Sequence, residues 1–429
     1  MYDDFGHEVK EMELFDFIKK SPNAYFAVDT MAAELKKAGF ERLEEKDSWK
    51  IKPGKYFVTR DDSSLIAFII PKKNFDGFHI AASHSDSPSF KIKPNPEMKV
   101  NDSYVKLNVE KYGGMIISTW FDRPLSVAGR VGVDTKTGIK TKLVNIDRDL
   151  LMIPSLAIHM DRTANDGHKY EVQKELLPLF AGKEADAKAS LLSLICKENG
   201  IKEKDVLDAD LFLYNRQAPV TFGAEGEFIA SPRLDDLQCA YASLTGIEKA
   251  KPSSYIAMHA VFNNEEVGSS TKQGAASSFL TDVIDRICEG FSLTAEDRVR
   301  KLSSSFMISA DNAHALHPNY PEKTDPTNKP VLNGGIVIKY NANQHYTTDA
   351  VSSAYLRKLC KKAGAPVQEY VNPSDIAGGS TLGSIATARV SMSTVDIGLP
   401  QLAMHSSYET AGKKDTDDLG RVLKEFFNE

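Results

Sequence analysis

Cysteine is scarce in this chain of 429 residues. The four present, Cys196, Cys239, Cys288 and Cys360, are widely separated and form no CxxC pair. This spacing predicts reduced thiols and argues against both a disulfide framework and a thiolate zinc site. No apolar run approaches the roughly 18–20 residues that a membrane span needs, and the acidic, amphipathic N-terminus is unlike a signal peptide. We therefore expect a cytoplasmic protein with no membrane partner.

The chain also lacks an excess of positive charge. Its net charge is −6 at pH 7, with 53 basic against 59 acidic side chains. This balance argues against a general nucleic-acid-binding protein. The hydrophobic content of 41% and the charged content of 26% are typical of a globular protein. The length exceeds that of one ordinary compact core, so two domains are expected.

The hydrophobic patterns divide the chain into two kinds of region. Residues 9–39 are expected to be helical, and short strand-like runs follow. The middle of the chain has many short alternating segments with turns between them, which predicts an antiparallel sheet. From about residue 233 helices and strands alternate, which predicts an α/β layer with a largely parallel sheet covered by helices. The expected domains are one α/β domain and one inserted β-rich domain: residues 1–90 with 233–429, and residues 91–232. Segments within the insertion are expected to be strands at 104–112, 115–120, 128–133 and 140–146, and helical at roughly 183–214.

Several of the expected strands end in side chains that bind metal ions. The runs "FHIAAS", "YIAMHAVF" and "SSFMISA" each lead into histidine or carboxylate residues. In open α/β sheets, ligands bind beyond the carboxyl ends of the strands, so these side chains are expected to meet. Two further acids open a helix in "SPRLDD", and a histidine lies in "QLAMHSSYE". The candidates are His84, Asp86, Asp235, Asp236, Glu265, Glu266, Asp311 and His405, with His314 and His317 just beyond Asp311.

Each candidate has an ordinary interpretation when it is taken alone. Acids at a helix start favour the helix dipole, and an aspartate after a strand commonly caps a turn. Two adjacent glutamates such as Glu265 and Glu266 often lie in a solvated loop. Their joint occurrence at several strand ends favours a shared site instead. A set of histidines and carboxylates without cysteine suits a hydrolytic zinc, cobalt or manganese centre.

The local spacing adds a division of roles. His84 and Asp86 are two residues apart, so they share one face of an extended segment. Asp86 can then accept the second N–H of the imidazole or lie behind a neighbouring metal. Glu265 and Glu266 are adjacent and should diverge, so one is expected to bind metal and the other to take a proton from water. The residues alone leave open which glutamate does which.

Five motifs carry a resemblance to a known family. In chain order they are "HSDSP", "SPRLDD", "NNEEVGS", "SADNAHALHPNY" and "PQLAMHS". Their order and separations resemble those of the M18 metalloaminopeptidases, the aspartyl aminopeptidase or aminopeptidase I family, and the likeness covers essentially the whole chain. The resemblance implies a zinc-peptidase-like α/β fold and an enzyme that removes the N-terminal residue from peptides. It also implies that the β-rich insertion is a dimerisation domain and that dimers assemble into a tetrahedral dodecamer.

The resemblance further implies two divalent ions per subunit, with zinc the first choice and cobalt or manganese as alternatives. Asp235 matches the residue that bridges the two ions, and Glu265 matches the general base. Asp86 matches the aspartate behind the first histidine. The other matched metal ligands are His84 and Asp311 for one ion, and Glu266 and His405 for the second.

Two more positions concern substrates and subunits. Lys339 matches a lysine associated with a preference for acidic N-terminal residues, and His159 matches a histidine that reaches the active site of a partner subunit. Asn263 stands where the family usually has an acid, a departure that lies outside the matched ligands. The alternative functions are a related dinuclear aminopeptidase of the M42 type and a catalytically silent shell for assembly or cargo binding. Because all five matched ligand positions hold competent side chains, the sequence favours the enzyme.

Overall fold

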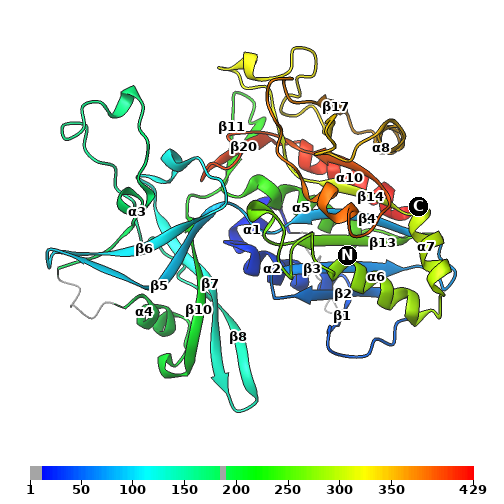
Figure 1. The fold of residues 1–429 in the computed structure, drawn as a ribbon, viewed down its shortest axis with the longest axis horizontal. Helices are drawn as coiled ribbons and strands as arrows, with labels where there is room; N and C mark the ends of the chain where they lie inside the picture. Colours follow the sequence, from blue (N-terminus) through cyan, green and yellow to red (C-terminus); the bar gives the residue numbers. More distant parts are fainter. Residues whose placement is uncertain (1–11, 184–189) are drawn as a thin grey trace.

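A nine-stranded sheet forms the centre of one half of the molecule (Figure 1). The structure is a computed structural model that describes residues 12–183 and 190–429, so the start of the expected first helix lies outside the described residues. Five of the eight neighbouring strand pairs are parallel, which confirms the predicted largely parallel sheet. In spatial order the strands are β1 (Glu41–Leu43), β2 (Gly54–Arg60), β3 (Ser64–Ile70), β13 (Ile256–Phe262), β4 (Phe78–His84), β14 (Phe306–Ala310), β18 (Ser393–Gly398), β16 (Ile336–Lys339) and β17 (Val367–Tyr370).

Helices cover both faces of this sheet. One face carries α1 (Leu14–Lys20), α2 (Ala24–Lys37), α5 (Leu234–Glu248), α8 (Ala350–Ala363) and α10 (Asp415–Asn428). The other carries α6 (Phe279–Gly290), α7 (Ala295–Ser303) and α9 (Leu382–Thr387). Strands β4 and β13 are buried along their whole length, and burial on both faces explains why they are apolar runs without alternation.

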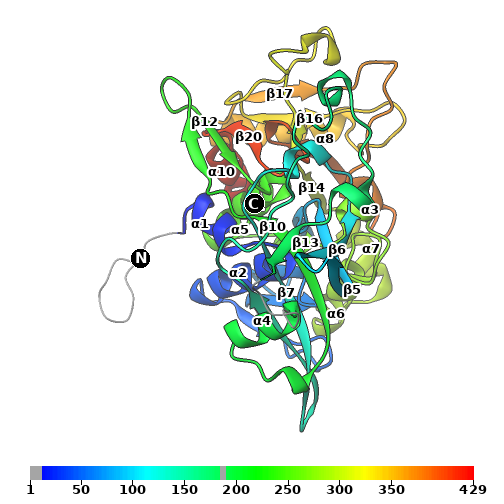
Figure 2. The same ribbon diagram turned by 90° about the vertical axis from the view of Figure 1, so that its left-hand side faces the viewer.

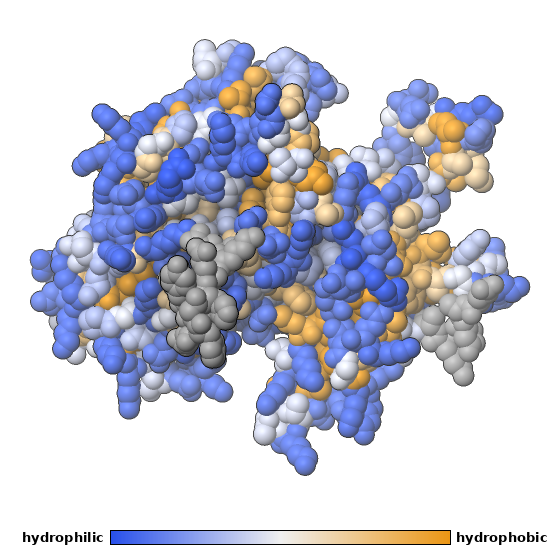
Figure 3. Space-filling model, turned by 180° about the vertical axis from the view of Figure 1, so that it is seen from behind, coloured by the Kyte–Doolittle hydropathy of each residue, from blue (hydrophilic) through white to orange (hydrophobic). Residues whose placement is uncertain are grey.

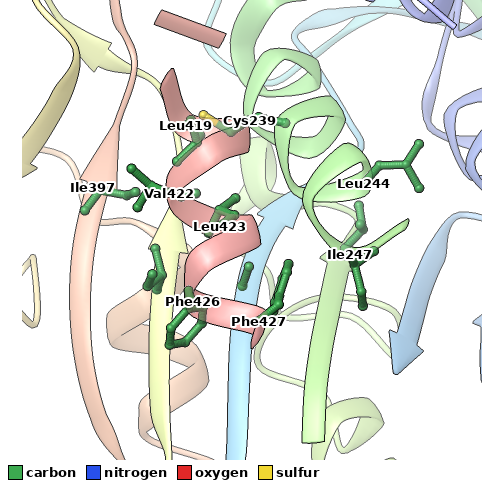
Figure 4. Close-up of a cluster of buried hydrophobic side chains, with 14 of the residues drawn as sticks. Cys239, Leu244, Ile247, Ile397, Leu419, Val422, Leu423, Phe426 and Phe427 are labelled. Carbon is green, nitrogen blue, oxygen red and sulfur yellow. The ribbon is translucent and has the colours of Figure 1, made fainter. Parts of the chain in front are cut away.

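The C-terminal helix α10 closes the first of these layers (Figure 4). Its side chains Leu419, Val422, Leu423 and Phe426 are fully buried and recur at the spacing of one helical face. They pack beside Ile247 of α5 and against the sheet in a single hydrophobic core. This packing holds the start of α5 beneath the carboxyl ends of the central strands, where the site is built.

A separate antiparallel sheet has its own hydrophobic core and lies in front of the α/β layer in Figure 2. Its strands, in spatial order, are β8 (Gly138–Asn145), β7 (Leu125–Thr135), β10 (Val206–Asn215), β5 (Ser89–Val100), β6 (Tyr104–Tyr112) and β9 (Leu179–Gly182). A third, five-stranded sheet has the order β11 (Val220–Phe222), β12 (Phe228–Ser231), β20 (Glu409–Gly412), β19 (Pro400–Leu402) and β15 (Ala313–His314). The division of the chain at residues 91 and 232, and the dimerisation role of the insertion, stay predictions.

Two expected elements within the insertion are wrong. Of the helical stretch predicted at 183–214, the described part from residue 190 onward contains α4 (Leu191–Glu198) and a short 3-10 turn, and its last part is strand β10. The end of this segment is a strand because it pairs with β7 and because Leu211 and Leu213 are buried. These tertiary contacts outweigh the charged residues at the start of the segment, which favoured a helix. The strand predicted at 115–120 is a 3-10 helix, Ile117–Trp120. This segment bonds to the loop at 403–407 rather than to a neighbouring strand.

Among the described residues, no helix has both the length and the apolar character required to cross a membrane. The cytoplasmic location stays a prediction.

Candidate active site

The ends of three adjacent strands bring together the residues predicted from strand ends. Strand β4 lies between β13 and β14 and is parallel to both, so all three end at the same edge. His84 is the last residue of β4, and Asp311 follows β14 directly. Glu265 and Glu266 begin a 3-10 turn, Glu265–Val267, just after β13. The predicted gathering at the strand ends is therefore present in the structure.

Asp235 lies at the centre of this group, with each carboxylate oxygen facing a different histidine. It sits near the start of α5 and is 3% exposed. Its Oδ1 is 3.4 Å from Nε2 of His84, and its Oδ2 is 3.3 Å from Nε2 of His405. His405 comes from the loop between β19 and β20. One carboxylate with two oxygens can hold two cations a few ångströms apart.

Each histidine has a further carboxylate on the side that faces Asp235. Nε2 of His84 is 3.6 Å from Oδ1 of Asp311, and Nε2 of His405 is 3.4 Å from Oε2 of Glu266. Oδ1 of Asp235 and Oε1 of Glu266 are buried and have no hydrogen-bond partner. Buried carboxylate oxygens without donors are costly, and a divalent cation would satisfy them. The His and carboxylate donor set fits zinc.

Both histidines are oriented by a main-chain carbonyl. Nδ1 of His84 is 3.1 Å from the carbonyl oxygen of Asp86, and Nδ1 of His405 is 2.5 Å from that of Gly114. A carbonyl only accepts, so each Nδ1 carries a hydrogen. The lone pair of each neutral ring therefore lies on Nε2, the atom that faces the carboxylates, as metal-binding histidines require.

Asp86 supports more than the first histidine. Its Oδ1 accepts the main-chain N–H of Glu265 at 3.1 Å and lies 3.5 Å from Nδ1 of His84. Its Oδ2 accepts the main-chain N–H of Glu266 at 3.2 Å and the hydroxyl of Tyr112 at 2.6 Å. Asp86 thus holds the turn that carries both glutamates in a fixed position relative to His84.

Burial and neighbouring charges tune the ionisable groups. Burial, together with the nearby carboxylates of Asp311, Asp86 and Asp235, raises the pKa of Glu265 to about 8, although His84 opposes this shift. A carboxyl group with such a pKa can both take up and release a proton near neutral pH. Burial lowers the pKa of His405, but its contact with Asp235 outweighs this and raises the pKa to about 9. Since a metal ligand must be deprotonated, a bound cation would displace that proton.

Asp236, the second acid of "SPRLDD", lies close to His84 and Asp311. These three residues form a second group that could hold a metal ion. Its Oδ2 accepts the main-chain N–H of His84 at 3.0 Å, so that oxygen is already bound. Burial raises the pKa of Asp236 well above its usual value, and Asp311 and Asp235 add to the effect. Asp236 therefore fixes the end of β4 through its hydrogen bond to the main chain of His84.

Sequence reasoning missed Glu409 and Tyr112. Glu409 accepts the main-chain N–H of Asp235 at 3.0 Å and that of His405 at 2.7 Å. It therefore holds Asp235 and His405 together through their main chains. Burial and the nearby Asp235 raise its pKa to about 8. Its only signal was an acid four residues after the histidine in "HSSYE". Tyr112 comes from the antiparallel sheet, and nothing in its local sequence marks it.

Lys339 is at the site, whereas His159 is not brought to it by this chain. Lys339 ends β16, is 3% exposed and places Nζ 3.6 Å from Oδ2 of Asp311. Burial lowers the pKa of Lys339, but Asp311 outweighs this and raises it above its usual value. His159 is exposed and lies in the loop that precedes α3 (Val172–Glu175). This loop extends away from the α/β layer (Figure 1).

Comparison with known proteins identifies the family. The sequence profile described as "Aminopeptidase I zinc metalloprotease (M18)" matches residues 17–427. A relative named "Probable M18 family aminopeptidase 2" from Clostridium novyi is 47% identical over 423 residues, covering 97% of this chain and 98% of the relative.

Solved structures agree with this match. The cryo-EM structure of the Ape4 and Nbr1 complex has a TM-score of 0.93 at 38% identity, covering 96% of this chain and 84% of that one. The structure of the S. cerevisiae mApe1 dodecamer has a TM-score of 0.84 at 29% identity, covering 96% and 95%. The M42-type alternative and the silent shell are therefore not supported. The chain belongs to the M18 family and is a metalloaminopeptidase, an exopeptidase of the zinc metalloprotease class.

Proposed function

We propose that this enzyme uses two divalent metal ions to remove the N-terminal residue of peptides. Zinc is the expected metal, with cobalt or manganese as alternatives. His84 and Asp311 would hold one ion, and Glu266 and His405 the other. Asp235 would bridge them. The observation that carries the proposal is that the two oxygens of Asp235 face the Nε2 atoms of two different histidines.

The bound ions would polarise the scissile carbonyl and make water more acidic. Glu265 would take the proton from the attacking water and then give it to the leaving amine, and its burial favours holding the proton between the two transfers. Asp86 would keep the Glu265 turn in place through its two main-chain hydrogen bonds. The acidic site would bind the free α-amine of the substrate, which restricts cleavage to the N-terminal residue.

Zinc content and cleavage of a free peptide test this proposal together. We expect two zinc ions per chain and release of the first residue from a short peptide. The same peptide with an acetylated N-terminus should be at least about 100-fold slower, because it lacks the charged amine that pairs with the acidic site. A protein that holds no more than one ion at full activity, or that cleaves both peptides equally, would contradict the proposal.

The preferred N-terminal residue is proposed to be aspartate or glutamate. Lys339 is buried, and its Nζ lies 3.6 Å from Oδ2 of Asp311, one of the metal-ligand candidates. Its Nζ also lies 5.6 Å from the ring centre of Tyr346. A buried ammonium group can pair with a substrate carboxylate, and a charge-assisted hydrogen bond of this kind contributes about 1.5–3 kcal/mol.

Replacing Lys339 with alanine should therefore lower kcat/KM for Asp- and Glu-terminated peptides by about 10- to 100-fold. A Leu-terminated peptide should be much less affected. Because Lys339 also contacts Asp311, zinc content must be measured on the same samples. Unchanged discrimination between Asp- and Leu-terminated peptides in a fully loaded variant would remove Lys339 from substrate selection.

We also propose that the enzyme assembles as a homo-oligomer built from dimers, up to a dodecamer such as that described for mApe1. The loop that carries His159 exposes the large apolar side chains Leu156, Ile158 and Met160, with exposed fractions of 60%, 47% and 75%. Apolar patches are visible on this projecting loop in Figure 3. A second subunit covering the loop would remove this surface from water and would bring His159 to the partner's active site.

A further inference from the structure

We propose that residues 112–119, which lead out of the antiparallel sheet, position the metal ligands of both halves of the active site, with Tyr112 as the principal side chain. This inference rests on the metal centre proposed above. It gives the inserted sheet a role in catalysis within its own chain, in addition to any role in assembly.

The first half of the site is held through the Tyr112 hydroxyl. Tyr112 ends β6, and its hydroxyl donates to Oδ2 of Asp86 at 2.6 Å. It accepts a hydrogen bond from the side-chain amide of Asn264 at 2.8 Å, which fixes the direction of the donated hydrogen. Asn264 directly precedes the turn of Glu265 and Glu266. Burial and the adjacent Asp86 raise the pKa of Tyr112, so the hydroxyl stays a donor.

The second half is held by the main chain that follows. The carbonyl of Gly114 accepts from Nδ1 of His405, and the N–H of Ile116 donates to the carbonyl of His405 at 3.0 Å. The hydroxyl of Thr119 accepts the N–H of Ser407 at 2.9 Å. The histidine is therefore fixed at its ring, at its own carbonyl and two residues further along the chain.

A glycine suits the point where this segment passes beside Glu266. Gly113 has φ +76°, and a Cβ built on it would lie 3.1 Å from Cβ of Glu266. This glycine lets the chain pass Glu266 between the Tyr112 side chain, which bonds to Asp86, and the main chain that bonds to His405. The fold of the insertion therefore sets the relative position of ligands that belong to two distant parts of the α/β layer.

The surroundings of Tyr112 limit the loss of metal affinity or activity expected when its hydroxyl is removed. A cavity of about 240 Å³ lies beside Tyr112 and Asp86, so a water molecule can enter and partly replace the lost donor. The ring itself packs edge-on against Phe212 at 5.5 Å, a contact that phenylalanine would keep. Loss of a group that orients a metal ligand typically costs about 10- to 100-fold in metal affinity or activity.

The test compares Tyr112→Phe with Tyr214→Phe in the full-length, zinc-loaded enzyme. Tyr214 lines the same cavity, but its hydroxyl donates to the side chain of Asn145 at 2.9 Å, within the antiparallel sheet. Zinc affinity is measured by competition with a chromogenic chelator, alongside kcat, KM and the melting temperature. We expect Tyr112→Phe to bind zinc about 10- to 100-fold more weakly or to lose the same factor in kcat at unchanged KM. Tyr214→Phe should match the wild type in zinc affinity and kcat.

Zinc affinity and kcat of Tyr112→Phe both within twofold of the wild type would overturn the inference. So would equal losses in the two variants, because this would show a general effect of a missing hydroxyl in the cavity. A wild-type protein that binds no zinc would instead contradict the proposed metal centre, so the two failures are distinguishable.

Discussion

Replacing Glu265 with glutamine is expected to lower kcat by about 10³-fold while both zinc ions stay bound, because glutamine keeps the size of the side chain but cannot accept a proton. The burial and neighbouring carboxylates that raise the pKa of Glu265 to about 8 fit a group that takes and returns a proton. The main-chain N–H of residue 265 would still donate to Asp86 in the variant. Steady-state kinetics and zinc analysis of the same preparation measure the effect.

Glu289→Gln provides the matched control. Glu289 is an exposed glutamate of α6, so its replacement tests the same chemical change away from the site. It should leave kcat and zinc content as in the wild type. If Glu265→Gln keeps both ions and the full rate, the assignment of the base is wrong.

The second large effect is expected on replacing Asp235, the proposed bridge between the two ions. Asp235→Asn should reduce zinc from two ions to fewer than one per chain and should reduce peptide hydrolysis to the background rate. The reason is that the variant removes the charge and one of the two oxygens that face His84 and His405. His405→Gln, which alters only one half of the site, should keep the ion held by His84 and Asp311. Zinc content by atomic emission distinguishes these outcomes.

Asp236→Asn is an informative control because the changed residue is the immediate neighbour. Burial raises the pKa of Asp236 well above its usual value, which favours the neutral form that asparagine resembles. The variant should keep both ions, since its amide oxygen can still accept the main-chain N–H of His84. Loss of zinc in Asp236→Asn with retention in Asp235→Asn would assign the metal to the group of His84, Asp236 and Asp311 instead.

Much of the α/β layer could be predicted from local patterns. The strands that end at His84 and just before Glu265 and Asp311 are apolar runs bounded by polar residues, and both features are readable along the chain. Because parallel strands end at one edge of a sheet, the prediction that these residues meet needed no distances. Strand β10 could not be predicted in this way, because its pairing with β7 is a long-range contact that outweighs local propensity.

The sequence by itself determined which side chains are available for the chemistry and which strand ends carry them. The resemblance then assigned a role to each glutamate. Only the tertiary structure decided that the oxygens of Asp235 face two different histidines, that Asp236 is held by the end of β4, and that Tyr112 reaches Asp86. The physical reason is that a side-chain direction depends on every element packed around it. Local periodicity carries no information about contacts such as that of Gly114 with His405, which are separated by 291 positions.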